Sequence, residues 1–525
     1  MAHILGIDAS TQGIAALVFD TVEMGIVAEA SINFGEDLPG YGAPQGFIPG
    51  GTEGIVHADP LMWLDGLELC LDRLKAGGAD LGRIEALSGA GQQHGTVYLK
   101  AEGQAVLNDL NPARGLADQF RGGFSRRTSP IWMDTSTSRQ CREIEATLGG
   151  PLSVCERSGS IAIERFSGPQ IRRFAVEEPE AYALTERIHL VSSFLASVLA
   201  GREAPIDHGD GAGMNLLNLE TLDWDPDLLG ATAPGLEERL PPARPSETPV
   251  GAVAEYFVER YGFARGAKVV AFTGDNPSSL VGMGAGTPGR VVISLGTSDT
   301  LFAAIEEPRT DPAGYGHVFG NPLGGFMTLQ CFLNGSLARE KVRDGLGMDW
   351  ATFSKALEAT PPGNAGKRML PFFGPEISPR VDAGEPLLGG GLGSDWTRDP
   401  AAVRACVEGQ FLNMRLRSEW MRLQPPVLYL TGGAAANDAI SRIAADVFQV
   451  EVRRLDVSSS VALGGALRAG LACEAIRGPD LEAYFGKALS SGKLVPDPAT
   501  ADLYAEALTE VRELQEAAGI IKKPL

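Results

Sequence analysis

Cysteine is scarce in this chain, and long apolar runs are absent. The 525 residues include six cysteines, which lie far apart and form no C-x-x-C pair. This spacing disfavours a disulfide framework or a zinc site and is typical of buried free thiols in a reducing compartment. No apolar stretch approaches the roughly 18 residues needed to cross a bilayer, and the N-terminus enters a short apolar strand without a basic leader. We therefore expect a soluble, cytoplasmic protein.

Positive charge is also in short supply. The sequence has 45 lysines and arginines against 66 aspartates and glutamates, which gives a formal net charge of -21. Such a field repels nucleic acid and anionic membranes, so we expect neither as a partner. An anionic small ligand would need local backbone dipoles and a divalent cation to offset the same field.

The chain is too long for one hydrophobic core, so two or more domains are expected. Apolar strand patterns alternate with helical ones, and this alternation predicts an α/β fold. The predicted strands span 4–8, 14–19, 26–34, 85–88, 96–99, 269–272 and 427–430, and a further strand ends at Asp134. The predicted helices span 61–74, with Asp59 and Pro60 as its cap and first residue, 140–148 and 501–519.

Glycine and proline mark the expected connections. Residues 35–58 and 386–395 are predicted to be loops, and 234–250 a linker or surface excursion. The glycine-rich run 282–289 is the best candidate for a hinge between two halves. We accordingly divide the chain into residues 1–284 and 285–525.

The two predicted halves begin in the same way. Residues 6–15, GIDASTQGIA, read as a strand, a tight hydroxyl-rich turn and a second strand, and residues 294–302, SLGTSDTLF, repeat that layout. Glycine lets backbone N–H groups approach a phosphate closely, and serine and threonine add hydrogen-bond donors. Neither turn matches the Walker pattern, and each alone is typical of a plain β-hairpin. As a pair at matching positions, they favour phosphate binding by two lobes that face each other.

Aspartates and a histidine follow several of the predicted strands, where ligands bind in open α/β sheets. Asp8 is interpreted as a Mg²⁺ ligand, with a turn-capping role as the alternative. Asp275 is interpreted as a general base near a helix start that Asn276 caps, with an Asx turn as the alternative. His94 lies beside Gln92 and Gln93, which makes a sugar-hydroxyl site plausible, although a lone histidine is more often structural. Arg165 is a surface arginine on local sequence alone.

Taken together, these residues closely resemble the FGGY family of carbohydrate kinases, and within it the xylulokinase type found in animals. The likeness runs over nearly the whole chain. It rests on LGIDASTQ at 5–12, LSGAGQQHG at 87–95, PIWMD at 130–134, SGSIAIERFSG at 158–168, PIDHGDGAGMNLL at 205–217, VVAFTGDNPSSL at 269–280, ISLGTSDTLF at 293–302 and LTGGAAAND at 430–438.

The resemblance implies two actin-like, ribonuclease-H-like domains with ATP and a sugar in the cleft between them. The implied reaction converts D-xylulose and ATP to D-xylulose 5-phosphate and ADP, with Mg²⁺ beside the phosphates. Asp275 would be the general base, and the ketose would contact His94, Arg165, Asp275 and Asn276. Residues 285–525 would form the nucleotide-binding domain. The nucleotide-side residues would be Ser10, Thr11, Gly296, Thr297, Ser298, Trp350, Gly433, Ala434 and Asn437, with Asp8 on the metal.

Two departures from the family pattern affect the choice of sugar. Many members carry Pro-Lys, then apolar residues and a tryptophan, where this chain has PQIRR at 169–173, and Ser136 replaces the arginine of the common W-x-D-x-R pattern. The alternatives are a family kinase for ribulose, glycerol or a sugar acid, an actin- or Hsp70-like ATPase without a sugar acceptor, and an inactive sugar sensor. A homodimer is allowed.

Overall fold

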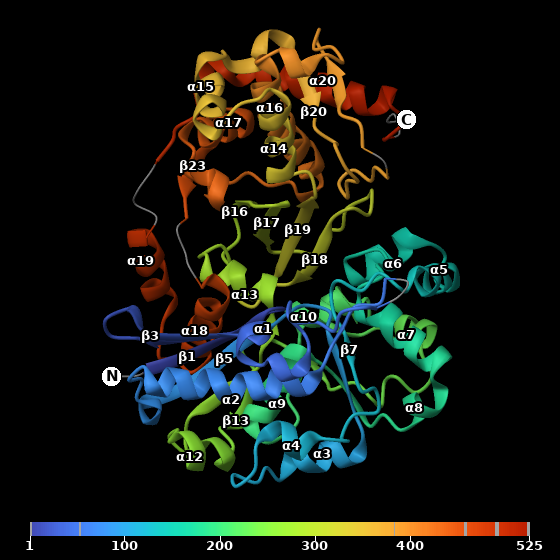
Figure 1. The fold of residues 1–525 in the computed structure, drawn as a ribbon, viewed down its shortest axis with the longest axis vertical. Helices are drawn as coiled ribbons and strands as arrows, with labels where there is room; N and C mark the ends of the chain where they lie inside the picture. Colours follow the sequence, from blue (N-terminus) through green and yellow to red (C-terminus); the bar gives the residue numbers. More distant parts are fainter. Residues whose placement is uncertain (1–2, 52–53, 383, 456–458, 489–492, 522–525) are drawn as a thin grey trace.

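The chain forms two lobes, one above the other in Figure 1. A computed structural model describes residues 3–521 apart from 52–53, 383, 456–458 and 489–492, so two residues of the predicted loop 35–58 lie outside the described residues. Each lobe is built on one main sheet. No helix of the described part is long and apolar enough to cross a membrane.

The first lobe is built on a seven-stranded sheet with β1 at its centre. β2 and β3 follow β1 as an antiparallel meander, while β5 pairs with its other side in parallel. β1 is buried along almost its whole length, which explains why it is nearly all apolar instead of alternating. The strands are β1 (His3–Ala9), β2 (Gly13–Asp20), β3 (Gly25–Asn33), β5 (Ile84–Gly91), β13 (Pro249–Ala252), β14 (Lys268–Val270) and β15 (Thr273–Gly274).

The second lobe repeats this arrangement in a six-stranded sheet. β16 takes the place of β1, β17 and β19 form its antiparallel meander, and β22 pairs with it in parallel. The repeat confirms the predicted likeness between the two hairpins. The strands are β16 (Arg290–Leu295), β17 (Asp299–Ile305), β18 (His317–Gly320), β19 (Phe326–Phe332), β22 (Val427–Thr431) and β23 (Glu451–Arg454).

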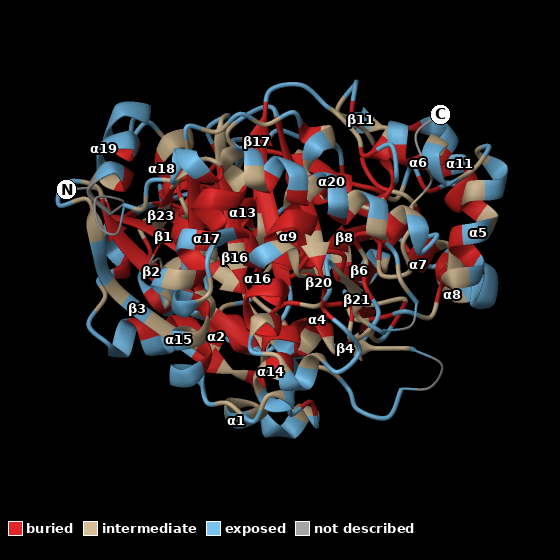
Figure 2. Cartoon of the chain, turned by 90° about the horizontal axis from the view of Figure 1, so that it is seen from above, coloured by how far each residue is buried: buried red, intermediate tan, exposed pale blue. Residues whose placement is uncertain are grey.

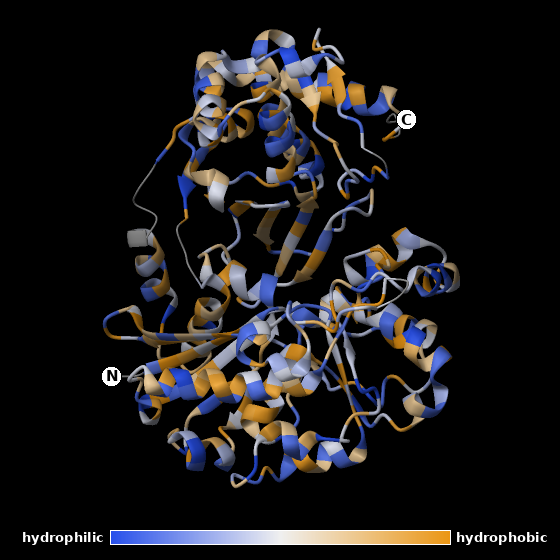
Figure 3. Ribbon diagram, in the orientation of Figure 1, coloured by the Kyte–Doolittle hydropathy of each residue, from blue (hydrophilic) through white to orange (hydrophobic). Residues whose placement is uncertain are grey.

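Helix α2 (Pro60–Ala76) shows how the sequence encodes a helix that covers a sheet. The Asp59 carboxylate accepts a hydrogen bond of 2.9 Å from the Leu61 N–H, and Pro60 supplies the fixed φ of the first position. The ribbon of Figure 3 shows hydrophobic residues recurring along the helix, and those at helical spacing, such as Trp63 and Leu67, are fully buried where the helix packs on β2 and β3. The predicted helix and its cap are confirmed.

Two helices join the lobes by packing against each other. α13 (Asp275–Gly282) follows the first sheet, and α18 (Ser460–Ala472) follows the second, yet α18 packs on β1 and β5 of the first. Figure 1 shows the red α18 beside the blue strands, and Figure 2 shows α13 buried at the centre. A Cβ on Gly282 would lie 1.8 Å from the Ser460 carbonyl oxygen, and one on Gly464 1.9 Å from that of Ser278. Glycine therefore permits this close crossing.

The other elements complete the two lobes. The other helices of the first lobe are α1 (Phe34–Asp37), α3 (Ala101–Asn108), α4 (Leu116–Phe120), α5 (Ser138–Thr147), α6 (Pro151–Ser158), α7 (Ser167–Glu177), α8 (Pro179–Ala183), α9 (Val191–Ala200), α10 (His208–Gly211), α11 (Pro226–Thr232) and α12 (Glu255–Tyr261). Those that follow β16 are α14 (Ser336–Gly345), α15 (Trp350–Ala359), α16 (Ala401–Arg417), α17 (Asp438–Phe448), α19 (Gly478–Ala488) and α20 (Ala501–Ala517). Short strands are β4 (His57–Ala58), β6 (Thr96–Leu99), β7 (Ser129–Pro130), β8 (Arg187–Leu190), β9 (Ile206–Asp207), β10 (Leu217–Asn218), β11 (Asp223–Trp224), β12 (Ala243–Arg244), β20 (Arg368–Leu370) and β21 (Leu387–Gly389).

Several expected features differ from the structure, including the predicted loop 35–58, which contains most of α1 and all of β4. The strand predicted to end at Asp134 ends at Pro130, as β7, and residues 131–134 form a turn closed by a 2.9 Å bond from the Asp134 N–H to the Ile131 carbonyl. The Asp134 carboxylate holds this turn by accepting N–H bonds of 2.9 Å from both Val56 and Ser136. The predicted loop 386–395 contains β21, and the predicted linker 234–250 contributes β12 and part of β13 to the first lobe. The division at 284/285 stays a prediction, and α18 belongs by its packing with the first sheet.

Candidate active site

The turn between β1 and β2 is held from several sides. The Ser10 hydroxyl donates to the Gly13 carbonyl at 3.1 Å, and the indole N–H of Trp132 donates to the Thr11 hydroxyl at 2.8 Å. A Cβ on Gly46 would lie 1.7 Å from the Thr11 carbonyl oxygen, so the 35–58 loop presses against the turn. The Trp132 side chain is 44% exposed despite this contact, which leaves its ring available to a ligand.

The turn between β16 and β17 is held by one buried ion pair. Asp299 accepts two hydrogen bonds from the Arg339 guanidinium, at 2.9 and 3.0 Å, and both side chains are buried. The Ser336 N–H, at the start of α14, donates to the Gly296 carbonyl at 2.9 Å. Thr297 and Ser298 are exposed at the turn's apex, and Gly296 is half-buried. The two hairpins therefore both place hydroxyl side chains at a turn that the surrounding chain fixes.

A pocket of about 600 Å³ lies beside the second turn. Six of the nine predicted nucleotide-side residues line it, whereas Ser10, Thr11 and Ser298 do not. Its lining comes from β16, α14, α15 and the segment that leads into α17, so the pocket belongs to the second sheet and its helices. The lining residues are Leu295, Gly296, Thr297, Ser336, Arg339, Trp350, Phe353, Ser354, Gly433, Ala434, Ala436, Asn437 and Ile440.

Trp350 and Asn437 are positioned by contacts across the pocket. Trp350 is 45% exposed, and the Arg343 guanidinium carbon lies 4.5 Å from its ring centre. Asn437 caps α17 by accepting from the N–H groups of Ala439 and Ile440, and its amide donates to the Ser354 hydroxyl at 2.6 Å. A flat aromatic ring and a half-open polar rim suit a heterocyclic base.

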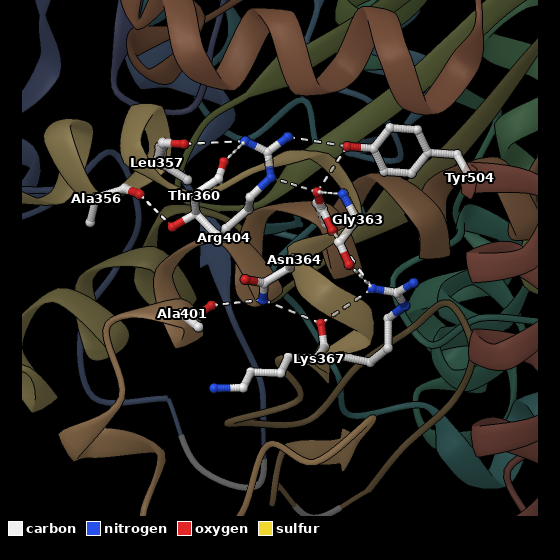
Figure 4. A network of polar contacts seen from close by, with 11 residues as sticks. Ala356, Leu357, Thr360, Gly363, Asn364, Lys367, Ala401, Arg404 and Tyr504 are labelled. Carbon is white, nitrogen blue, oxygen red and sulfur yellow. Dashed lines mark hydrogen bonds and ion pairs between the residues drawn. The ribbon is translucent and has the colours of Figure 1, made fainter. Parts of the chain in front are cut away.

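The far end of α15 is anchored by a polar network that sequence reasoning missed (Figure 4). Arg404 on α16 donates to the carbonyl groups of Leu357 and Thr360, at 3.1 and 2.8 Å. Its guanidinium also bonds the Glu408 carboxylate at 2.6 Å and the Tyr504 hydroxyl at 3.2 Å. The helix that carries Trp350 is therefore fixed at its C-terminal end by a buried arginine.

Asp8 and Asp275 form the acidic part of the site. Burial and the neighbouring Asp275 carboxylate raise the pKa of Asp8 to about 7. Burial raises the pKa of Asp275 to about 6, although N–H donors from Asn276 and Gln93 oppose this shift. Both carboxyl groups thus have a pKa near neutral pH, as expected of residues that accept a proton or bind a cation during a reaction.

Asn276 does not cap the helix, contrary to the sequence-based prediction. α13 begins at Asp275, with Gly274 as its N-cap, so Asn276 already lies in the first turn. Its side-chain amide donates instead to the side-chain Oε1 of Gln93 at 2.8 Å and to the Asp275 carboxylate at 3.1 Å. Asn276 therefore positions the predicted base Asp275 through a side-chain hydrogen bond and does not cap the helix.

A third carboxyl group, Asp210, lies behind Asp275 and received no role from the sequence. A Cβ on Gly274 would lie 2.9 Å from its Oδ1 atom, which is buried and has no hydrogen-bond partner. Burial and the nearby Asp207 raise the pKa of Asp210 well above its ordinary value. Only its place in the 205–217 motif gave a signal in the sequence.

His94 and Arg165 lie close together, because both contact the ring of Phe166. The His94 ring stacks on Phe166, with ring centres 4.2 Å apart, and its Nδ1 lies 2.7 Å from the Gly213 carbonyl oxygen. Since a carbonyl only accepts, Nδ1 carries the proton and Nε2 is left as an acceptor. Burial and the Arg165 charge hold the pKa of His94 well below its ordinary value. His94 is therefore a neutral hydrogen-bonding group rather than a base.

Asp8, the predicted metal-binding residue, fits a cation that is held partly by the protein and partly by the phosphate oxygens of a bound molecule. Among the described residues no group of three or more His, Cys, Asp or Glu side chains could hold a metal ion. The Asp8 Oδ1 atom is nevertheless buried without a partner. One carboxylate plus phosphate oxygens and water is a common way to bind Mg²⁺, so Asp8 fits that role.

We expect Asp8→Asn to stabilise the ligand-free protein much more at pH 8 than at pH 4. The pKa of Asp8 rises from 3.8 to about 7 on folding, so folding stability is lost as pH rises between those values. Removing the charge should recover about 1–3 kcal/mol at pH 8. Thermal unfolding without metal or nucleotide measures this. An equal difference between variant and wild type at both pH values would contradict the assignment.

Comparison with known proteins places these features in one family. The FGGY family of carbohydrate kinases matches in both parts, its N-terminal domain at residues 128–282 and its C-terminal domain at 291–473. The chain is 42% identical to the xylulose kinase of Rattus norvegicus over 525 residues, covering 98% of this chain and 96% of the rat protein. It is 40% identical to xylulose kinase 2 of Arabidopsis thaliana, covering 89% and 86% of the two chains.

The solved structure of xylulose kinase from Rhodospirillum rubrum has the same fold. It aligns with a TM-score of 0.82 at 19% identity, over 98% of this chain and 99% of that one. The predicted α/β fold with two ribonuclease-H-like halves is confirmed. With both family domains matched and a relative at 42% identity along nearly its whole length, this chain belongs to the FGGY family of carbohydrate kinases.

Proposed function

We propose that this kinase transfers the γ-phosphoryl group of ATP to a terminal hydroxyl of D-xylulose, giving D-xylulose 5-phosphate and ADP. The observation that carries the proposal is the half-buried carboxylate of Asp275, which begins α13 close to Asp8 at the first hairpin turn and has a pKa raised to about 6. The identity to the rat xylulose kinase supports the choice of sugar.

In this reaction Asp275 accepts the hydroxyl proton, and the sugar oxygen attacks the γ-phosphorus. The bond from that phosphorus to the bridging oxygen of ADP breaks, and ADP leaves with the electron pair. A base with a pKa near 6 is ionised at neutral pH and still basic enough to take a proton as the reaction proceeds. The neutral His94, with Arg165 and Asn276, would bind the ketose hydroxyl and carbonyl groups.

The nucleotide would lie in the pocket beside the second turn. Its base would contact Trp350, Gly433, Ala434 and Asn437, and its phosphates the two turns with Ser10, Thr11, Gly296, Thr297 and Ser298. Mg²⁺, if held by Asp8, would neutralise charge on the phosphate oxygens. We also expect a cytoplasmic location. A homodimer is compatible with this proposal, and light scattering would measure the mass of the particle in solution.

The test is ADP release from Mg²⁺-ATP with D-xylulose, D-ribulose, L-xylulose, glycerol and no sugar. Turnover on D-xylulose well above the other acceptors supports the proposal. Preference for another polyol keeps the kinase mechanism and overturns the substrate. ADP release that no sugar changes would favour an ATPase instead.

A further inference from the structure

We propose that His317, which the second lobe contributes, is a substrate-binding residue of the sugar site. Its Nε2 atom would hydrogen-bond an oxygen of the bound ketose and so help to select the sugar. The inference rests on the proposed function, because it concerns the acceptor site of that reaction.

His317 is fixed where the two lobes meet. It is the first residue of β18, and the next residue, Val318, donates its N–H to the Gly159 carbonyl of the first lobe at 2.9 Å. A Cβ on Gly159 would lie 2.3 Å from the Val318 carbonyl oxygen, so the two backbones touch. This contact brings a side chain of the second sheet beside the segment that leads to Arg165.

The imidazole of His317 shares its surroundings with the predicted sugar residues. Its ring centre lies 5.7 Å from that of Phe166, which also stacks on His94. The Arg165 charge acts on both imidazoles and, together with burial, lowers both pKa values, that of His317 to about 3. His94, Phe166, Arg165 and His317 therefore form one cluster drawn from both lobes.

One nitrogen of this ring is satisfied and the other is not. Nδ1 lies 3.0 Å from the Ser160 hydroxyl, whereas Nε2 is buried and has no partner. The residue is only 2% exposed, so water from bulk solvent does not reach it freely. Leaving a buried polar atom unpaired is unfavourable, and a sugar oxygen at this position would remove that cost.

Replacing His317 by asparagine or by glutamine tests the roles of its two ring nitrogens separately. The shorter amide introduced by His317→Asn reaches the place of Nδ1 and retains a partner for Ser160, while the longer side chain of His317→Gln reaches the place of Nε2. We expect His317→Asn to raise KM for D-xylulose about tenfold, as for one lost hydrogen bond to a buried group, with KM for ATP unchanged. His317→Gln should keep a KM for D-xylulose within about threefold of wild type.

A merely structural histidine gives a different pattern. In that case both variants change the thermal midpoint and leave the KM for D-xylulose as in wild type, and this result would overturn the inference. Deoxy analogues of D-xylulose provide an independent check. The His317→Asn defect should disappear for the one analogue that lacks the contacted hydroxyl, and a defect of equal size for every analogue would count against a direct contact.

The outcome is separable from that of the proposed function. A wild-type enzyme that prefers another ketose overturns D-xylulose as the substrate. The same two variants, assayed with the preferred ketose, then decide whether His317 binds the acceptor. Since the pKa of His317 is lowered to about 3, the ratio of variant to wild-type KM for the ketose should not depend on pH between about 6 and 8.

Discussion

Replacing Asp275 by asparagine is expected to lower kcat by about 10²–10⁴-fold, the usual cost of removing a general base. Asparagine keeps the shape of the side chain and can still accept from the Asn276 N–H, which lies 2.8 Å from the carboxylate. It cannot take the hydroxyl proton. Nucleotide binding should be retained, because Asp275 does not line the pocket beside the second turn. ADP release and calorimetric titration with ATP measure the two effects.

Asp210→Asn is the matched control for this experiment. Its carboxyl is buried near Gly274, and burial raises its pKa well above the ordinary value and so favours the neutral form. The proposed mechanism assigns it no proton transfer, so a neutral amide should replace it with little loss of kcat. Wild-type kcat/KM should fall as pH drops through about 6–7, where Asp275 and Asp8 gain protons. An Asp275→Asn enzyme with full activity and the same pH profile would exclude the general-base role.

Breaking the Arg339–Asp299 pair should have the largest effect on stability. Asp299→Ala would leave a buried guanidinium without its carboxylate, and such changes cost about 3–5 kcal/mol. Gln410 accepts from Arg339 at 3.0 Å, but an amide oxygen does not neutralise the charge. Because Arg339 lines the pocket, affinity for ATP should fall as well. Urea unfolding followed by circular dichroism measures the loss.

An exposed pair on the same helix serves as the control. Asp344 pairs with Arg343 at the surface, and Asp344→Ala should change stability by less than about 0.5 kcal/mol. If Asp299→Ala does not fold, Asp299→Asn retains a hydrogen-bond acceptor and tests the charge alone. Equal unfolding midpoints for the Asp299 and Asp344 variants would show that the buried pair contributes no more than a surface one.

Local features were predictable from the sequence because short segments encode them. The two hairpins, the Asp59 cap and the place of Asp275 after a strand all depend on neighbours within a few residues. The prediction that Asn276 caps α13 was wrong for one local and one distant reason. Gly274 takes the extended cap conformation, and the Asn276 amide donates to the side chain of Gln93, 183 residues away.

Groups that act through distant contacts could not be predicted. His317 meets Ser160 across 157 positions, and Arg404 meets Tyr504 across 100. Both are ordinary residues in their own segments, a strand and a helix, and only packing gives them partners. Asp210 is similar, because its significance comes from Gly274 and Asp275 on another element. The roles of all three depend on tertiary structure that periodicity does not encode.

Because α18 follows the second sheet in the chain but packs on the first, this kinase cannot be cut at one point into two independently folding halves. A fragment ending at residue 284 would lack the helix that covers β1 and β5, and would expose apolar residues such as Ile4 and Leu17. The complementary fragment would carry Ala462 and Leu463 with no sheet to bury them. We expect each fragment to aggregate when expressed alone, and the two to assemble when they are produced together.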